Sequence, residues 1–150
     1  MNGIKLRGLG RCVPAQSVTN DDLAKTVDTS DAWITARTGI RSRRRCTEET
    51  HTELCVTAAR RALAQAGITP ADIGACIVAT VSADTIVPSA ACMLQRELGM
   101  PEDTPCFDLN AACTGFIYAL HTMECLLNAA PRKFGLVVGA EALSKVVDWT

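Results

Sequence analysis

A continuous apolar run from Ala75 to Val81 constrains the fold of this chain more than any other stretch. Runs of this kind, rich in β-branched residues, are typical of a strand that is buried on both faces. Two further short strands are predicted at 106–109 and 134–139, and helical patterns fill the intervals between the three strands. Strands and helices that alternate in this way favour a parallel sheet with right-handed crossovers. The sequence therefore predicts an α/β fold.

Capping residues mark the helices of this region. Thr50 and Glu53 form a capping box, Ser89 is an N-cap, and Gly67 and Gly99 stand where helices commonly end. The predicted helices are 51–66, 90–98 and 114–129.

The first 50 residues show weaker patterns. Ile4–Gly8 is predicted to be a short strand, and Thr19 and Asn20 should begin a short helix that runs to about Val27. A second helix should start around Ser30 and end at Gly39, and the basic stretch 41–45 follows it.

The length of 150 residues is about that of one domain, and the net charge of −1 argues against a globally basic nucleic-acid-binding protein. No apolar run approaches the roughly 20 residues of a membrane-spanning helix. The first seven residues do not have the pattern of a signal peptide. We therefore expect a cytoplasmic protein that binds neither nucleic acid nor membranes.

Eight cysteines raise the question of disulfides or a metal site. The chain has no Cys-x-x-Cys pair and only two histidines, and several cysteines lie inside apolar runs, such as Cys76. This pattern favours reduced thiols that pack as small hydrophobic side chains, and no metal site is expected.

Cys113 differs from the other cysteines because it lies between a predicted strand and a predicted helix. Backbone N–H groups and the helix dipole at such a junction favour the thiolate, which is the nucleophilic form. In open parallel sheets, ligands bind beyond the carboxyl ends of the strands, which is where Cys113 falls. The residues alone leave two interpretations open: a nucleophile that attacks thioesters, or a cysteine that only packs.

Several segments resemble one enzyme family. The stretch Asn110–Phe116 is similar to the nucleophile motif of β-ketoacyl-acyl-carrier-protein synthase III, the initiating condensing enzyme of the thiolase superfamily. Four other stretches resemble the same family in the same order: Asp28–Ile34, Arg37–Arg41, Val87–Cys92 and Leu136–Glu141.

The resemblance implies a thiolase-like fold and an acyl-transfer reaction. Residues 1–150 would be the N-terminal half of a layered αβαβα architecture, with the C-terminal half absent. The family joins a short acyl-CoA primer to malonyl-acyl carrier protein through an acyl-cysteine, with loss of CO2. Its catalytic His and Asn come from the C-terminal half. Coenzyme A would enter as a substrate, no cofactor is implied, and a homodimer is expected.

The resemblance also assigns individual roles. Cys113 would be the nucleophile, Trp33 would stack on the adenine of coenzyme A, and Arg37 would contact its phosphates or the mouth of the pantetheine tunnel. Thr29 is a further candidate for an adenine contact, and Val87 would close the acyl pocket of the partner subunit. Without the resemblance, Trp33 could be a core residue of an amphipathic helix, Arg37 an exposed helix arginine, and Thr29 a helix cap.

Neither histidine is expected to replace the missing catalytic pair. His121 lies eight residues beyond Cys113 on the same predicted helix, about 12 Å along its axis, and His51 should lie at a solvated helix start. The basic stretch 41–45 could attract an acidic carrier protein or simply be a solvated face.

Three functions remain open at this point. The first is a condensing enzyme of the synthase III type. The second is a related tailoring acyltransferase of secondary metabolism, which would share the same N-terminal motifs. Valine at position 87 is smaller than the phenylalanine that many family members carry there, so a longer or branched primer could fit. The third is a non-catalytic half-length subunit.

Overall fold

A computed structural model describes residues 3–149 of the chain, which divides into two compact units. Residues 1–12 and 50–141 form the first unit, and residues 13–49 and 142–150 form the second. Each unit has its own hydrogen-bonded sheet, with three strands in the first and two in the second.

The sheet of the first unit is parallel, as predicted. Strand β3 (Ile73–Ala79) lies between β4 (Cys106–Leu109) and β5 (Phe134–Gly139), and both neighbours run in its direction. Strand β3 begins two residues earlier than expected, where Ile73 pairs with Phe134. It also ends two residues earlier, because Val81 leaves the ladder and donates its N–H to the Glu141 side chain. The predicted bounds of β4 and β5 are confirmed.

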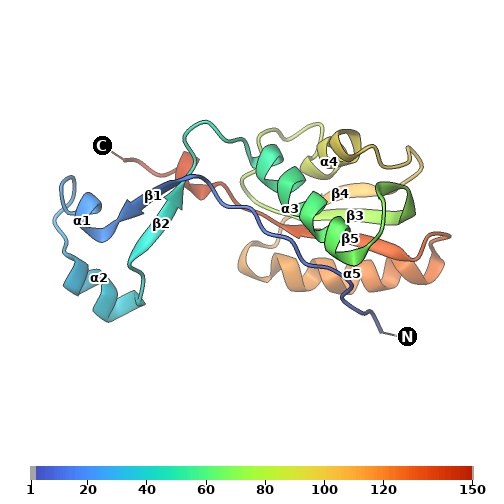
Figure 1. Ribbon diagram of the computed structural model, residues 1–150, viewed down its shortest axis with the longest axis horizontal. Helices are drawn as coiled ribbons and strands as arrows, with labels where there is room; N and C mark the ends of the chain where they lie inside the picture. Colours follow the sequence, from blue (N-terminus) through green and yellow to red (C-terminus); the bar gives the residue numbers. More distant parts are fainter. Residues whose placement is uncertain (1–2, 150) are drawn as a thin grey trace. The chain divides into compact units, whose positions relative to one another are not determined.

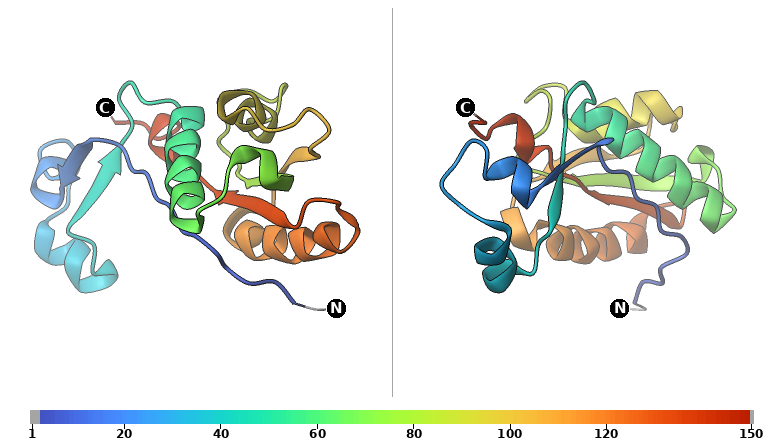
Figure 2. Two further views of the ribbon diagram at one scale, coloured as in Figure 1. Left: turned by 45° about the vertical axis from the view of Figure 1, so that its right-hand side comes forward. Right: turned by 60° about the vertical axis from the view of Figure 1, so that its left-hand side comes forward.

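Helices cover both faces of this sheet. On one face lie α3 (His51–Ala66) and α4 (Ala90–Leu98), and on the opposite face lies α5 (Gly115–Ala129), as Figures 1 and 2 show. Short 3-10 turns precede β3 and α5: η1 (Pro70–Asp72) and η2 (Ala112–Thr114).

The core forms two layers, one on each side of β3. Cys76 and Val78 pack with α3 and α4, whereas Ala75, Ile77 and Ala79 pack against α5. Successive side chains of a strand point to opposite faces, so one apolar run supplies both layers. Every residue of β3 is buried, which confirms the interpretation of the run.

The predicted boundaries of α3 and α4 are confirmed, and α5 begins one residue later than predicted. The capping box of Thr50 and Glu53 begins α3, the hydroxyl of Ser89 accepts a hydrogen bond from the Cys92 N–H at the start of α4, and both helices end at glycines. Each cap satisfies a backbone N–H that has no partner inside the helix.

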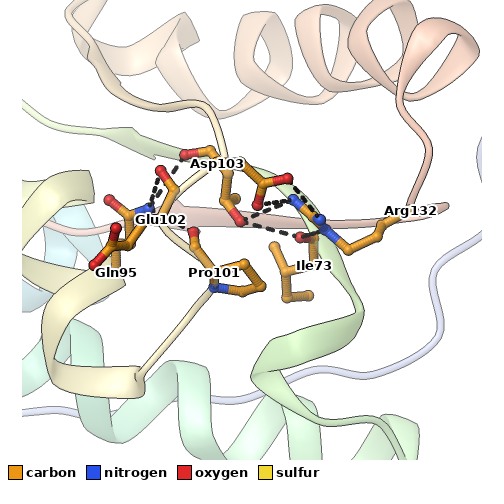
Figure 3. A network of polar contacts seen from close by, with 7 residues as sticks. Ile73, Gln95, Pro101, Glu102, Asp103 and Arg132 are labelled. Carbon is orange, nitrogen blue, oxygen red and sulfur yellow. Dashed lines mark hydrogen bonds and ion pairs between the residues drawn. The ribbon is translucent and has the colours of Figure 1, made fainter.

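Polar side chains join the loops at the amino edge of the sheet (Figure 3). Arg132 donates from Nε to the Ile73 carbonyl at 2.7 Å and from Nη2 to Asp103 at 2.9 Å. Gln95 of α4 donates to the Pro101 carbonyl at 2.8 Å. These contacts connect the start of β3 with the segments that precede β4 and β5.

The strand predicted at Ile4–Gly8 is wrong. This segment belongs to no strand and crosses α3 instead. A Cβ atom at Gly10 would lie 2.0 Å from the Ala58 carbonyl oxygen, so the two backbones touch. A helix offers no free row of backbone groups for a ladder, and the Leu9 N–H donates to the Gln65 side chain at 2.6 Å.

The second unit contains two strands that were not predicted. β1 (Gln16–Thr19) and β2 (Ser42–Arg45) pair antiparallel, and β2 coincides with most of the basic stretch. Its remaining elements are α1 (Asn20–Leu23), α2 (Asp31–Thr38) and the 3-10 turn η3 (Leu143–Lys145). Thus α1 ends four residues before the predicted end at Val27.

A buried asparagine organises this unit. Asn20 donates to Asp31 at 2.7 Å and to the Ile40 carbonyl at 2.8 Å, and its own carbonyl oxygen accepts from Arg43 at 2.7 Å. One side chain therefore connects α1, α2 and β2, which compensates for the small apolar content of the unit.

Candidate active site

Cys113 lies where the sequence predicts it, between a strand and a helix. It belongs to the turn η2, four residues after the end of β4 and directly before α5, and its side chain is exposed. Because the three strands are parallel, their carboxyl ends share one edge of the sheet, and Cys113 follows that edge. Ligands bind at this edge in open α/β sheets.

The turn that carries Cys113 has an unusual backbone. Ala112 has a φ of 44°, in the left-handed region that residues with a Cβ atom rarely adopt. The hydroxyl and the N–H of Thr114 both donate to the Ala111 carbonyl, at 2.9 and 3.2 Å, and so close the turn. Strained residues of this kind cluster at functional sites.

The start of α5 packs closely against the sheet. A Cβ atom at Gly115 would lie 3.3 Å from the Ala79 Cβ, so a larger residue there would press on the end of β3. In the neighbouring strand β5, the backbone of Gly139 at the strand's end lies under the Phe116 side chain. The turn of Cys113 is therefore built on the ends of all three strands.

The other cysteines differ from Cys113 in burial or in location. Burial, with Asp84 and Asp108 nearby, raises the pKa of the Cys55 thiol to about 12. A hydrogen bond with Cys106, together with burial, raises the pKa of Cys76 well above its ordinary value. These thiols stay protonated and unreactive. Cys125 is exposed like Cys113, but it lies near the middle of α5 rather than at a helix start.

The expectation for His51 is wrong. The residue begins α3 as predicted, yet its side chain is 0% exposed instead of solvated. Its Nε2 lies 3.0 Å from the Thr80 hydroxyl and 3.1 Å from the Ala140 carbonyl. The ring is buried because it fills the space between α3 and the carboxyl ends of β3 and β5. His121 is exposed on α5.

Val87 lies in the connection between β3 and α4, which leaves the same edge of the sheet as the turn of Cys113. Its side chain is 84% exposed and follows Ile86, which is 95% exposed. The Thr85 hydroxyl donates to the Pro88 carbonyl at 2.9 Å across this tip. Two apolar side chains are thus presented outward, and the role of Val87 in an acyl pocket stays a prediction.

Trp33, Arg37 and Thr29 belong to the second unit. Helix α2 has no buried residue, and Trp33 is 53% exposed, which excludes the alternative that it is a core residue of this unit. The Arg37 guanidinium carbon lies 4.2 Å from the centroid of the Trp33 ring. A cation–π contact of this kind orients both side chains.

The capping alternative for Thr29 is also wrong. The hydroxyl of Ser30 caps α2 by accepting from the Trp33 N–H at 3.1 Å. Thr29 precedes the cap and is only half-buried, so a ligand contact remains open to it.

Most of the basic stretch is engaged inside the second unit. Arg43 bonds to Asn20, Arg44 donates to the Ala15 carbonyl at 2.9 Å, and Arg45 lies 4.4 Å from the centroid of the Trp149 ring. These contacts explain why the sequence places arginines on β2. The attraction of an acidic carrier protein by the basic stretch stays a prediction.

Three further properties of residues 3–149 bear on ligands. A hollow of about 540 Å³ lies among the N-terminal segment, α3, α5 and β5, and Cys113 is not among the residues that line it. No group of three or more His, Cys, Asp or Glu side chains in this part of the chain is arranged to hold a metal ion. None of its helices combines the length and apolarity needed to cross a membrane.

Comparison with known proteins agrees with this geometry. Residues 107–150 match the family model for 3-oxoacyl-[acyl-carrier-protein (ACP)] synthase III. The β-ketoacyl-[acyl-carrier-protein] synthase III of Clostridium acetobutylicum is 48% identical over 149 residues, which cover 99% of this chain and 46% of the relative. The chain therefore spans about half the length of the curated relatives that it matches.

Solved structures show the same fold. The 3-oxoacyl-[acyl-carrier-protein] synthase III of Aquifex aeolicus superposes with a TM-score of 0.92 at 44% identity, covering 98% of this chain and 47% of that one. A priming β-ketosynthase from the R1128 polyketide biosynthetic pathway gives a TM-score of 0.90 at 35% identity, with 97% and 43% covered. In sequence and in its thiolase-like α/β fold, the chain is similar to β-ketoacyl-[acyl-carrier-protein] synthase III enzymes over about half of their length.

Proposed function

We propose that the protein carrying this chain is a condensing acyltransferase that starts fatty acid synthesis from a short acyl-CoA and malonyl-acyl carrier protein. The observation that carries the proposal is Cys113, an exposed thiol on a strained turn before α5, inside the segment that matches the family model. The names of the relatives support the same class of reaction.

In the first step, the Cys113 thiolate attacks the carbonyl carbon of the acyl-CoA thioester. A new carbon–sulfur bond forms, the bond to the coenzyme A sulfur breaks, and the released thiolate takes up a proton. In the second step, malonyl-acyl carrier protein loses CO2, and the resulting carbanion attacks the acyl-cysteine and releases the Cys113 thiolate. A His and an Asn outside this chain would promote the decarboxylation. The thiol and the loss of CO2 supply this chemistry without a resident cofactor.

The second unit would hold the nucleotide part of coenzyme A. Trp33 is exposed and has Arg37 over its ring, so an adenine base would stack on the indole while the guanidinium offers donors to phosphate. Thr29 is a candidate for a further contact with the base. A homodimer and a cytoplasmic location are proposed from the family resemblance.

A tailoring acyltransferase is the second candidate. The likeness to a priming β-ketosynthase of a polyketide pathway favours it, as does the small side chain of Val87, which leaves room for a longer primer. A non-catalytic half-length subunit is the third. Mass spectrometry of the natural protein decides that alternative, since a mass near twice the 16.0 kDa of this chain contradicts it.

The decisive experiment is covalent labelling of the natural protein with radioactive acetyl-CoA or another short acyl-CoA. We expect label on Cys113, and Cys113→Ala should reduce it at least a hundredfold. Cys125→Ala is the matched control because Cys125 is also exposed but lies within α5, and this variant should label normally. Label that survives Cys113→Ala refutes the assignment of the nucleophile.

A further inference from the structure

The connection from Thr80 to Ser89, called here the 80–89 loop, is held by three carboxylates that the family resemblance does not assign. The loop joins β3 to α4 (Figure 1). Within it, the side chains of Ile86 and Val87 are almost fully exposed. An exposed apolar tip keeps a defined position only if the rest of the loop is anchored, so these anchors decide where Val87 lies.

Glu141 anchors the beginning of the loop. Its two carboxylate oxygens accept from the Val81 N–H at 3.0 and 3.3 Å, and one of them also accepts from the Thr80 hydroxyl at 3.4 Å and from the Ser82 hydroxyl. Hydrogen bonds to an ionised acceptor are roughly twice as strong as neutral ones. Glu141 follows β5, so the loop is tied to a neighbouring strand.

Two aspartates anchor the rest of the 80–89 loop. Asp84 accepts from the N–H groups of His51 and Thr52, at 3.0 and 2.8 Å, and so binds the loop to the start of α3. Asp108 of β4 accepts from the first two N–H groups of α4, both at 2.8 Å, directly after the loop ends. Negative side chains are favourable at both helix starts because the helix dipole is positive there.

His51 supports the Glu141 anchor from inside the core. The Ala140 carbonyl can only accept, so Nε2 of His51 carries the proton and also faces the Thr80 hydroxyl. The Thr80 hydroxyl is then directed to Glu141. Nδ1 of the same ring lies 3.6 Å from the Cys55 sulfur. A continuous chain of hydrogen bonds thus leads from the core to the carboxylate.

We propose that Glu141 is a positioning residue that sets the acyl-chain selectivity of the enzyme by holding the 80–89 loop and, through it, Val87. The inference rests on the proposed function, because only that function makes Val87 part of an acyl pocket. Glu141 and the turn of Cys113 both follow the carboxyl edge of the sheet, and the hydrogen bonds of Glu141 go to the loop. Its loss should therefore change which acyl group fits without changing the nucleophile.

The test is Glu141→Gln in the natural protein. Glutamine keeps the size of the side chain but has one acceptor oxygen in place of two, so it cannot bind Val81 and Ser82 as the carboxylate does. Glu102→Gln, in the connection between α4 and β4, is the matched control because Glu102 is exposed. Three quantities are measured: hydrogen exchange of the amides of 81–88, the ratio of kcat/KM for hexanoyl-CoA to that for acetyl-CoA, and the alkylation rate of Cys113.

We expect Glu141→Gln to raise amide exchange in 81–88 at least tenfold and to change the hexanoyl-to-acetyl ratio about tenfold, with Cys113 alkylation within twofold of the wild type. The control should change none of these. Unchanged exchange in a folded Glu141→Gln protein overturns the anchoring role, and faster exchange with an unchanged ratio overturns the role in selectivity.

Failure of the proposed function gives a different pattern. If the wild-type protein takes no acyl group from either thioester, the condensing activity and the selectivity role are both refuted. The exchange measurement still decides whether Glu141 anchors the loop.

Discussion

At the scale of single residues, carboxylates that accept backbone N–H groups recur in both units. Asp108 and Asp84 cap helices, Glu141 holds a loop, and Glu49 accepts from the N–H groups of Ala15 and Thr47 at 2.8 and 3.1 Å. A charged acceptor strengthens hydrogen bonds of this kind, so each carboxylate ties together segments of the chain.

Glu49 gives a measurable case. Backbone N–H groups, that of Ala15 first, lower its pKa to about 2, whereas an unfolded chain has a glutamate pKa of about 4.3. A depressed pKa contributes stability above the unfolded value, and this contribution disappears as the pH falls towards 2. Glu49→Gln should lower the free energy of unfolding at pH 7, and its difference from the wild type should shrink between about pH 4.5 and pH 2.

Urea unfolding of both proteins across this pH range measures the difference. Glu48→Gln is the control, because Glu48 is exposed and makes no such bonds, and its difference from the wild type should stay flat. A Glu49→Gln difference that does not depend on pH would contradict the role of the carboxylate.

Single residues also show the limits of sequence reasoning. Cys113 was located because strand, turn and helix are local patterns that adjoin it. The burial of His51 does not follow from local sequence, because it depends on Thr80 and Ala140, which are 29 and 89 residues away. Glu141 belongs to a motif that was recognised, yet no local pattern reveals that its carboxylate binds the N–H of Val81, 60 residues away.

At the scale of elements, the sequence predicts the parallel sheet of the first unit, but it predicts neither the strands of the second unit nor the course of the N-terminal segment. A strand such as β3, buried on both faces, has a continuous apolar pattern that needs no knowledge of its neighbours. In contrast, β1 and β2 are short and polar, and their pairing and arginine contacts appear only in three dimensions. The N-terminal segment has a strand-like pattern, but Gly8 and Gly10 let it lie on α3 instead.

Arg132 provides a test at the same scale, because it joins the start of β3 to two loops. Arg132→Ala removes the donor to the Ile73 carbonyl and should lower the free energy of unfolding by about 1–2 kcal/mol. Arg96→Ala is the control, since Arg96 is exposed and pairs with its neighbour Glu97. It should cost at most about 0.5 kcal/mol. Equal losses in chemical denaturation would contradict the anchoring role of Arg132.

At the scale of the whole molecule, the first turn of α5 exposes apolar side chains to solvent. Ile117 is 64% exposed, Tyr118 54% and Phe116 42%. Large apolar patches promote association. We expect the chain of residues 1–150, produced alone, to bind a hydrophobic dye and to form oligomers in analytical ultracentrifugation, and Ile117→Lys should reduce both. A monomeric chain with sharp near-ultraviolet dichroism and no dye binding would contradict this expectation.

The second unit is assembled from two parts of the chain that lie far apart in sequence. The Cys46 N–H donates to the Ser144 hydroxyl at 2.9 Å, across 98 residues, and Arg45 stacks on Trp149. Closing so long a loop is costly in entropy and slow. During synthesis on the ribosome, β2 emerges early, but its contacts with Ser144 and Trp149 can form only after nearly a hundred further residues have been added. The unit proposed to hold the nucleotide is therefore among the last regions of this chain to mature, although most of its residues are made first.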